Sequence, residues 1–382
     1  MSFTLSLTRS RLLGSLSVGE GVGFNPVAQA HATPPGAENG LVLKKLLPYA
    51  VLLFALSGYA RNHCLHFDPF TVVVLPDTQM YTTDKFYDLD LFSVQTEWIV
   101  ANEEALNIKF VLHEGDLVHR VPPTPDNLEE WARAEYSMSL LDGFVPYAIA
   151  PGNHDGLGRS RDAVELNDYF PVSKYEDLPT FGGVFEEGRI ENTYHYFSAG
   201  GVDWLVLALE FGPRDLVLDW ANEVVANHPY RQVMVVTHAY LYSENTLHGS
   251  ATYHRWNPHG YPVADDPGGV NDGVEIWEKL VRKHENIMFV FSGHILFDGA
   301  GLRVSAGDHG NLVYQMLANY QMKSLGGSGF LRIVRFDPSE NIVDIETYSP
   351  YLDEYNTDPQ HQFGFELDIF NSEFIQFASG ER

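Results

Sequence analysis

The stretch Tyr147-Ala-Ile-Ala-Pro-Gly-Asn-His-Asp155 is a short apolar run that ends abruptly in turn-forming and polar residues. Its first half lacks the alternation of apolar and polar residues, which is typical of a strand buried on both faces. Its second half places an amide, an imidazole and a carboxylate directly after that strand. Because ligands of open α/β sheets bind beyond the carboxyl ends of the strands, the stretch predicts a functional site at a strand end.

The same pattern recurs along the chain. Further apolar runs are each followed by polar residues of the types that commonly bind metals in proteins. These runs and the residues after them are 71–75 with Pro76-Asp77-Thr78-Gln79, 109–113 with Glu114-Gly115-Asp116, 232–237 with His238, and 287–291 with Ser292-Gly293-His294. Oxygen donors mixed with imidazole suit zinc, iron or manganese, and two ions that share one carboxylate suit hydrolysis of phosphate esters. Each motif alone is also a plausible turn or helix cap, but the recurrence at successive strand ends favours a metal site.

Amphipathic segments lie between the apolar runs and predict helices. The helical segments are 90–106, 126–141, 213–227 and 273–285. Strands that alternate with helices predict a layered α/β domain. The tail differs, because 329–336, 342–347 and 363–369 look like strands without intervening helices, which predicts antiparallel additions. We expect one catalytic domain over residues 68–382.

In these motifs the sequence resembles the calcineurin-like metallophosphoesterase superfamily. The resemblance runs from Asp77 to His294 and is most specific at Gly115-Asp116 and 152–155, and the Pro-Asp-Thr-Gln motif is similar to that of a subgroup of exported bacterial members. It implies a four-layer α/β/β/α fold, in which a β-sandwich of mixed sheets is flanked by helices. It also implies one or two divalent metal ions and hydrolysis of phosphomonoesters or phosphodiesters by a metal-activated water.

The resemblance also assigns roles to individual residues. Asp116 would bridge two metals, Asn153, His238 and His294 would complete the second metal site, and Asp77 with Gln79 would serve the first. His154 would donate a proton or stabilise charge near the leaving oxygen, with Asp155 orienting it.

Two positions depart from the family signature, and both belong to the first metal site. Gln79 and Leu296 stand where the signature has histidine. A glutamine can offer a carbonyl oxygen but leucine cannot ligate, so we expect a weaker first site in which Asp298 or His309 is the alternative replacement. The loss of a ligand also leaves open a metal-binding surface protein of the same fold with weakened or lost catalysis.

The long loop of residues 239–272 follows His238 directly and is predicted to overhang the metals as a lid, although a surface insertion without a catalytic role is the alternative. We expect substrate contacts from Arg255 and His254 in this loop and from Arg159 after the Gly-Asn-His-Asp turn. Arg161 is a further candidate, but arginines at such places commonly pair with surface acids.

The composition limits the possible partners. Asp and Glu number 51 against 24 Lys and Arg, for a net charge of −27, and the chain has one cysteine, Cys64. An acidic surface repels nucleic-acid backbones, so we expect a small phosphate ester as substrate, no nucleic-acid partner, and a nuclease only as a less favoured alternative. Cysteine-based metal sites and an intrachain disulfide are excluded. The sequence does not indicate an oligomeric state.

The N-terminal region predicts export. Lys44 and Lys45 precede an apolar run from Leu46 to Ala60 that ends in Gly58-Tyr59-Ala60, as a signal peptide does, and the run is too short to favour a stable membrane span. Residues 1–43 are expected to be a disordered leader or to lie upstream of the true start of translation. We therefore expect a periplasmic or extracellular protein.

N-terminal sequencing of the protein isolated from its native source tests this expectation. Cleavage after the small-residue end of the 44–60 segment predicts a mature chain that begins near Arg61. A mature chain that begins near Met1 would contradict it.

Overall fold

The computed structural model describes residues 67–120, 125–162, 164–367 and 369. The described residues all belong to one compact unit, which lies within His63–Arg382. The predicted leader of 1–43 and the signal-like segment of 44–60 lie outside the described residues.

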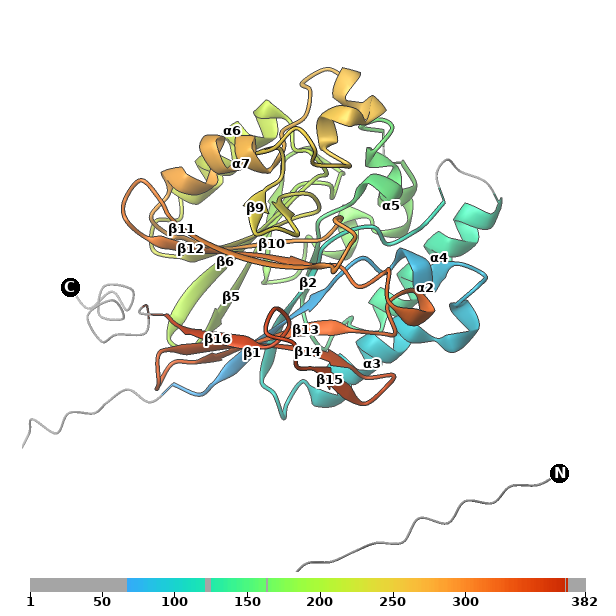
Figure 1. Cartoon of the computed structure of the whole chain (residues 1–382), viewed down its shortest axis with the longest axis horizontal. Helices are drawn as coiled ribbons and strands as arrows, with labels where there is room; N and C mark the ends of the chain where they lie inside the picture. Colours follow the sequence, from blue (N-terminus) through green and yellow to red (C-terminus); the bar gives the residue numbers. More distant parts are fainter. Residues whose placement is uncertain (1–66, 121–124, 163, 368, 370–382) are drawn as a thin grey trace, which may run out of the picture. The chain divides into compact units, whose positions relative to one another are not determined.

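The core consists of two seven-stranded sheets that pack face to face (Figure 1). The first sheet has the order β15(Glu354–Asn356), β14(Ile342–Ser349), β13(Leu331–Asp337), β1(Phe70–Leu75), β2(Ile108–His113), β3(Tyr147–Ile149), with β16(Phe363–Glu366) also paired to β14. The second has the order β11(Ala300–Ala306), β12(Leu312–Ala318), β10(Ile287–Ser292), β7(Gln232–Thr237), β6(Val202–Leu209), β5(Thr193–Ala199), β4(Phe181–Val184). In the first sheet β1, β2 and β3 are parallel and the strands from β13 to β15 join them in antiparallel pairs. In the second sheet the central strands β12, β10, β7 and β6 are parallel and both edges are antiparallel, so both sheets are mixed.

Helices cover the outer faces of both sheets. On the first sheet lie α3(Leu91–Asn102) and α4(Pro125–Ser139), and on the second lie α6(Asp215–Ala226) and α7(Gly273–Lys279) (Figure 1). The four-layer α/β/β/α sandwich is therefore confirmed, as are the antiparallel strands of the tail. Shorter helices, α2(Gln79–Thr82) and α5(Val164–Tyr169), and the small hairpin β8(Leu241–Tyr242) and β9(Thr246–Leu247) lie in the connecting loops.

The central strands are apolar throughout because both of their faces are buried. In β1, Val72 and Val74 contribute to the core between the sheets, whereas Val73 and Leu75 pack in the core beneath α3 and α4. The absence of a polar face is what a strand needs when helices cover one side and a second sheet covers the other.

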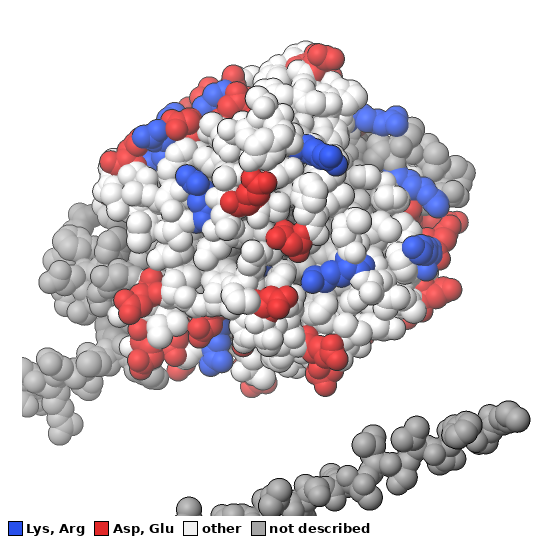
Figure 2. Space-filling model, in the orientation of Figure 1, with Lys and Arg blue, Asp and Glu red and all other residues white. Residues whose placement is uncertain are grey.

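No helix among the described residues combines the length and apolar character needed to cross a bilayer. On the face drawn in Figure 2, lysines and arginines are scattered among acidic and uncharged side chains rather than gathered into one band.

Trp204 provides a test of the sandwich. Its fully buried ring lies 5.3 Å from that of Phe336 and 5.9 Å from that of Phe70, across the interface between the sheets. Replacing Trp204 by Ala should lower the free energy of unfolding by about 3–5 kcal/mol, because truncating a buried tryptophan leaves a cavity. Urea unfolding measures the change. Tyr230→Ala, at a position 72% exposed, is the control, and a loss below about 1 kcal/mol in Trp204→Ala would contradict the packing.

Candidate metal centre

The polar strand ends of the two sheets meet at one edge of the sandwich. Asp116 follows β2, His238 follows β7 and His294 follows β10, and each of them offers a ligand atom within 4.8 Å of the other two. All three side chains are buried. The structure thus brings together residues that are separated by up to 178 positions in sequence (294 minus 116).

One nitrogen lies at the middle of this group. Nε2 of His238 is 3.1 Å from Oδ1 of Asn153, 3.1 Å from Nδ1 of His294 and 3.3 Å from Oδ2 of Asp116. The predicted second-site ligands Asp116, Asn153, His238 and His294 therefore surround one point. Each of these atoms carries a lone pair, and their mutual approach is favourable only if a proton or a cation lies among them.

In His238 and His294, the ring nitrogen that points away from the centre makes a hydrogen bond that determines which nitrogen faces the centre. Nδ1 of His238 lies 2.7 Å from the carbonyl oxygen of Glu114, and Nε2 of His294 lies 2.7 Å from that of Trp256. A carbonyl oxygen only accepts hydrogen bonds, so both outer nitrogens carry hydrogen and donate it. This arrangement leaves the inner nitrogens as ligands, which is how outer partners orient histidines at metal sites.

The glycines of the motifs let the carboxylates approach the backbone. A Cβ on Gly152 would lie 2.1 Å from Oδ1 of Asp116, and a Cβ on Gly293 would lie 2.2 Å from Oδ1 of Asp77. Asp116 and His294 themselves have φ angles of 53° and 68°, an uncommon conformation for residues with side chains. Such strain is typical of functional sites.

Burial and neighbouring charges shift the pKa values of Asp77, His238 and Asp116. Burial raises the pKa of Asp77 to about 7, and the charge of Asp116 contributes to the rise. Burial alone would lower the pKa of His238, but Asp116 and Asp77 raise it to about 9. The pKa of Asp116 is below its ordinary value, because His238 and His154 outweigh the effect of burial. In the metal-free protein a proton on Nε2 of His238 thus takes the place of a cation.

Asp77 is held by side chains that the sequence did not single out. Its Oδ1 accepts a hydrogen bond from the backbone nitrogen of His294 at 3.1 Å, and its Oδ2 accepts from Nδ2 of Asn319 and Nε2 of Gln321, both at 3.0 Å. Asn319 follows β12, which pairs in parallel with β10. The signal that could have identified it is the one used elsewhere: a polar residue directly after an apolar run.

Gln79 fits the role of a neutral ligand. It begins α2 and is 2% exposed, its Nε2 lies 3.4 Å from Nδ1 of His119, and its buried Oε1 has no hydrogen-bond partner. Of the two alternative replacements for the missing histidine, His309 lies in the loop between β11 and β12 and contacts the carbonyl oxygen of Lys283 at 3.1 Å, so that expectation is wrong. Asp298 is exposed and follows β10, and its role stays a prediction.

The expected pairing of His154 with Asp155 is also wrong. Nδ1 of His154 lies 2.6 Å from the carbonyl oxygen of His119, and the two imidazole rings stack at 5.3 Å. Asp155 is instead fully committed to the backbone: Oδ1 accepts from Leu117 and Val118, and Oδ2 accepts from Gly152. Asp155 therefore fixes the loops that carry the ligands, and it does not orient the imidazole.

A cavity of about 360 Å³ opens beside the centre. It is lined by His119, Asn153, His154, Gly158, Arg159, Tyr261 and Pro262. Arg159 thus lies where a substrate phosphate contact was predicted, next to Asn153 and His154.

The loop of residues 239–272 overhangs the centre, but through other residues than those predicted. It supplies the Trp256 carbonyl and the Tyr261 ring, which packs 6.0 Å from the ring of His294. His254 stacks at 3.9 Å on Tyr242 and accepts a hydrogen bond from the backbone of Gly249, so it belongs to the interior of the loop. Arg255 is exposed and does not line the cavity.

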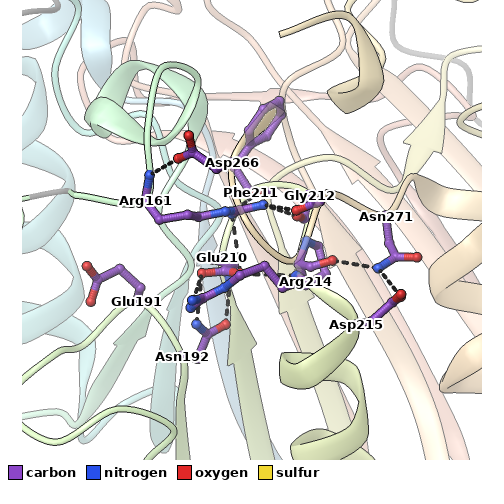
Figure 3. A network of polar contacts seen from close by, with 12 residues as sticks. Arg161, Glu191, Asn192, Glu210, Phe211, Gly212, Arg214, Asp215, Asp266 and Asn271 are labelled. Carbon is purple, nitrogen blue, oxygen red and sulfur yellow. Dashed lines mark hydrogen bonds and ion pairs between the residues drawn. The ribbon is translucent and has the colours of Figure 1, made fainter. Parts of the chain in front are cut away.

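A buried charge network supports the wall of the site (Figure 3). The guanidinium of Arg161 donates to the carbonyl oxygens of Phe211, Gly212 and Gly269, and it lies 3.3 Å from Oε1 of Glu210. The ring of Phe211 in turn lies 5.3 Å from that of His294. Arg161 therefore anchors this wall, and the suggestion that it binds phosphate is wrong.

Metal binding should depend on pH, because an ion must displace the proton of His238. With a pKa of about 9, His238 is protonated below that value in the metal-free protein. The apparent affinity should therefore rise about tenfold per pH unit from pH 7 to 9 and level off above 9. Competition with a metal indicator at several pH values measures it. An affinity that does not change between pH 7 and 9 would contradict the assignment.

Comparisons with known proteins identify the family of the chain. Residues 70–298 match the family model described as calcineurin-like phosphoesterase. The Bacillus subtilis protein YvnB is 30% identical over 315 residues, which cover 79% of this chain, and this chain spans 22% of the length of that relative. A dimetal phosphatase from Danio rerio is 14% identical with a TM-score of 0.45, covering 79% of this chain and 100% of its own. The Plasmodium protein GAP50 is 12% identical with a TM-score of 0.42, covering 81% and 94%. The chain belongs to the calcineurin-like phosphoesterase family.

Proposed function

We propose that the protein hydrolyses small phosphate esters with the help of divalent metal ions bound by Asp116, Asn153, His238 and His294. The observation that carries the proposal is the convergence of these four side chains around Nε2 of His238, beside an open cavity. The membership of the family supports metal-dependent hydrolysis of phosphate esters in general.

The donor set fits a metal. Two imidazoles, an amide oxygen and a carboxylate form the mixed set that zinc, iron and manganese accept, and the outer nitrogens of both imidazoles are already fixed by carbonyl oxygens. A divalent ion bound there supplies Lewis-acid activation of water and of the phosphoryl group.

The residues of the chain perform the remaining tasks. Arg159 lines the cavity and provides positive charge for the non-bridging oxygens of the substrate. His154 lines the same cavity, and its Nδ1 donates to the carbonyl oxygen of His119. When both ring nitrogens carry hydrogen, His154 is the general acid of the reaction and donates the proton on Nε2 to the leaving oxygen of the ester. Tyr261 and Pro262 also line the cavity.

Leu296 stands where the family signature has a histidine. This replacement favours one alternative, a protein of this fold that binds metal but has lost catalysis. Leu296 is half-buried and offers no ligand atom. Wild-type protein that binds metal yet hydrolyses neither a monoester nor a diester would support this alternative. A nuclease is disfavoured by the acidic composition. We also propose export, on the grounds of the signal-like sequence of 44–60 alone.

Substitution tests the catalytic assignment. Asn153→Ala removes a proposed ligand and His154→Ala removes the proposed proton donor, so each should lower turnover of an aryl phosphate or a bis-aryl phosphate by at least about 100-fold. The panel is run with zinc, iron and manganese added separately. His309→Ala removes an exposed imidazole far from the ligands and is the matched control. Unchanged turnover in both Asn153→Ala and His154→Ala would refute the assignment.

A further inference from the structure

The loop of residues 239–272 contributes a hydrogen-bond acceptor to the metal centre. The backbone carbonyl oxygen of Trp256 accepts from Nε2 of His294 at 2.7 Å. This contact orients the imidazole, because the outer partner of a ligating histidine fixes its ring and its tautomer. Any residue that holds the Trp256 carbonyl in place therefore acts on the centre.

The backbone at Trp256 needs such support. Its φ angle is 60°, in the left-handed region, which is uncommon for a residue with a bulky side chain. A conformation of this kind costs free energy and persists only where the surrounding structure holds it. The contacts of the preceding residue, Arg255, identify the support.

Two buried side chains hold the main chain of Arg255. Its backbone N–H donates to the hydroxyl oxygen of Tyr242 at 3.2 Å, and its carbonyl oxygen accepts from Nε2 of His248 at 2.9 Å. Tyr242 is 3% exposed and His248 is fully buried, whereas Arg255 itself is exposed. Both polar groups of this main chain are thus fixed directly before the strained residue.

His248 is in turn fixed to its surroundings by its backbone. Its N–H donates to the carbonyl oxygen of Tyr240 at 2.9 Å, and its carbonyl oxygen accepts from the N–H of Val274, in α7, at 3.1 Å. Its Nδ1 is buried without a hydrogen-bond partner, so the bond to Arg255 is the one that its ring makes within the described part of the chain. The buried imidazole is therefore placed to hold this single carbonyl oxygen.

We propose that His248 is a positioning residue for the metal centre, and that it acts on His294 through the backbone of residues 255–256. The inference rests on the proposed function and adds to it a residue outside the set of ligands. Because coupling between two sites is reciprocal, this backbone should be more ordered when the centre holds a metal, and metal should bind more tightly when this backbone is ordered.

Hydrogen exchange of the wild-type chain tests this coupling without any substitution. The full chain is stripped of metal, and peptides that contain Arg255 are followed by mass spectrometry with and without saturating zinc. We expect the amide of Arg255 to exchange at least about fivefold more slowly with zinc. The amide of Ser339, which is hydrogen-bonded in the turn between β13 and β14, is the control and should not change. Equal exchange of Arg255 in both states would overturn the proposal.

Substitutions at His248 test the residue itself. His248→Phe keeps a buried ring but cannot donate to Arg255, so zinc affinity, measured by competition with a metal indicator, should fall about tenfold. His248→Gln offers an amide N–H in place of Nε2 and should restore most of the affinity. The matched control is His228→Phe, which should leave the affinity unchanged. The His228 ring also lies against a backbone carbonyl oxygen, that of Val224 at 2.7 Å, but it precedes β7, whose other end carries His238.

Unchanged zinc affinity in folded His248→Phe, or a loss that His248→Gln does not reduce, would overturn the assignment. If His248→Phe does not fold, Tyr242→Phe takes its place, because it removes only the hydroxyl group that accepts from Arg255. It should also weaken zinc binding, and an unchanged affinity would contradict the support of this backbone. A failure of the proposed function is distinct, because the wild type would then couple zinc binding to exchange and yet hydrolyse no phosphate ester.

Discussion

The mutual approach of ligand atoms at the sheet edge is the constraint on which the rest of the structure depends. Nδ1 of His294 and Oδ2 of Asp116 both lie within 3.3 Å of Nε2 of His238, in a region that excludes solvent. Lone pairs at such distances repel one another unless positive charge lies between them. Asp116 and Asp77 raise the pKa of His238 against the effect of burial, which favours a proton on His238 in the metal-free protein.

The sandwich holds these atoms in place from several directions. Asp116 and Asn153 come from one sheet, and His238 and His294 come from the other, so the two sheets contribute opposite halves of the centre. Carbonyl oxygens of Glu114 and Trp256 fix the outer ring nitrogens, and Asp155 ties together the loops after β2 and β3. The core between the sheets therefore determines the geometry of the centre, because a shift of one sheet against the other separates the ligands.

Much of this organisation could be predicted from the sequence. Continuous apolar runs identified the central strands, since burial on both faces leaves a clear signal, and the polar residues after these runs gave the candidate metal ligands. Among the strands of the two large sheets, β4, β5, β11, β12 and β15 were missed. β4, β11 and β15 are edge strands with partly exposed residues, and β5 alternates buried with partly exposed residues. β12 lies inside its sheet and is almost wholly buried, but Gln315 interrupts its apolar run. The loss of β12 from the prediction is why Asn319 and Gln321 were missed as well.

The remaining errors concern side-chain direction, which spacing does not encode. Asp155 stands next to His154 in sequence, yet its oxygens turn to the backbone of Leu117 and Gly152. His254 and Arg161 have side chains that can bind phosphate. However, His254 stacks on Tyr242, and the guanidinium of Arg161 donates hydrogen bonds to backbone carbonyl oxygens. Such outcomes depend on long-range packing, which brings partners together from distant parts of the chain.

Anomalous diffraction from crystals of the protein grown with zinc tests the central claim most directly. The account predicts an anomalous peak bonded to Asp116, Asn153, Nε2 of His238 and Nδ1 of His294, at distances of about 2.0–2.2 Å. A crystal saturated with zinc that shows no peak among these four side chains would contradict it.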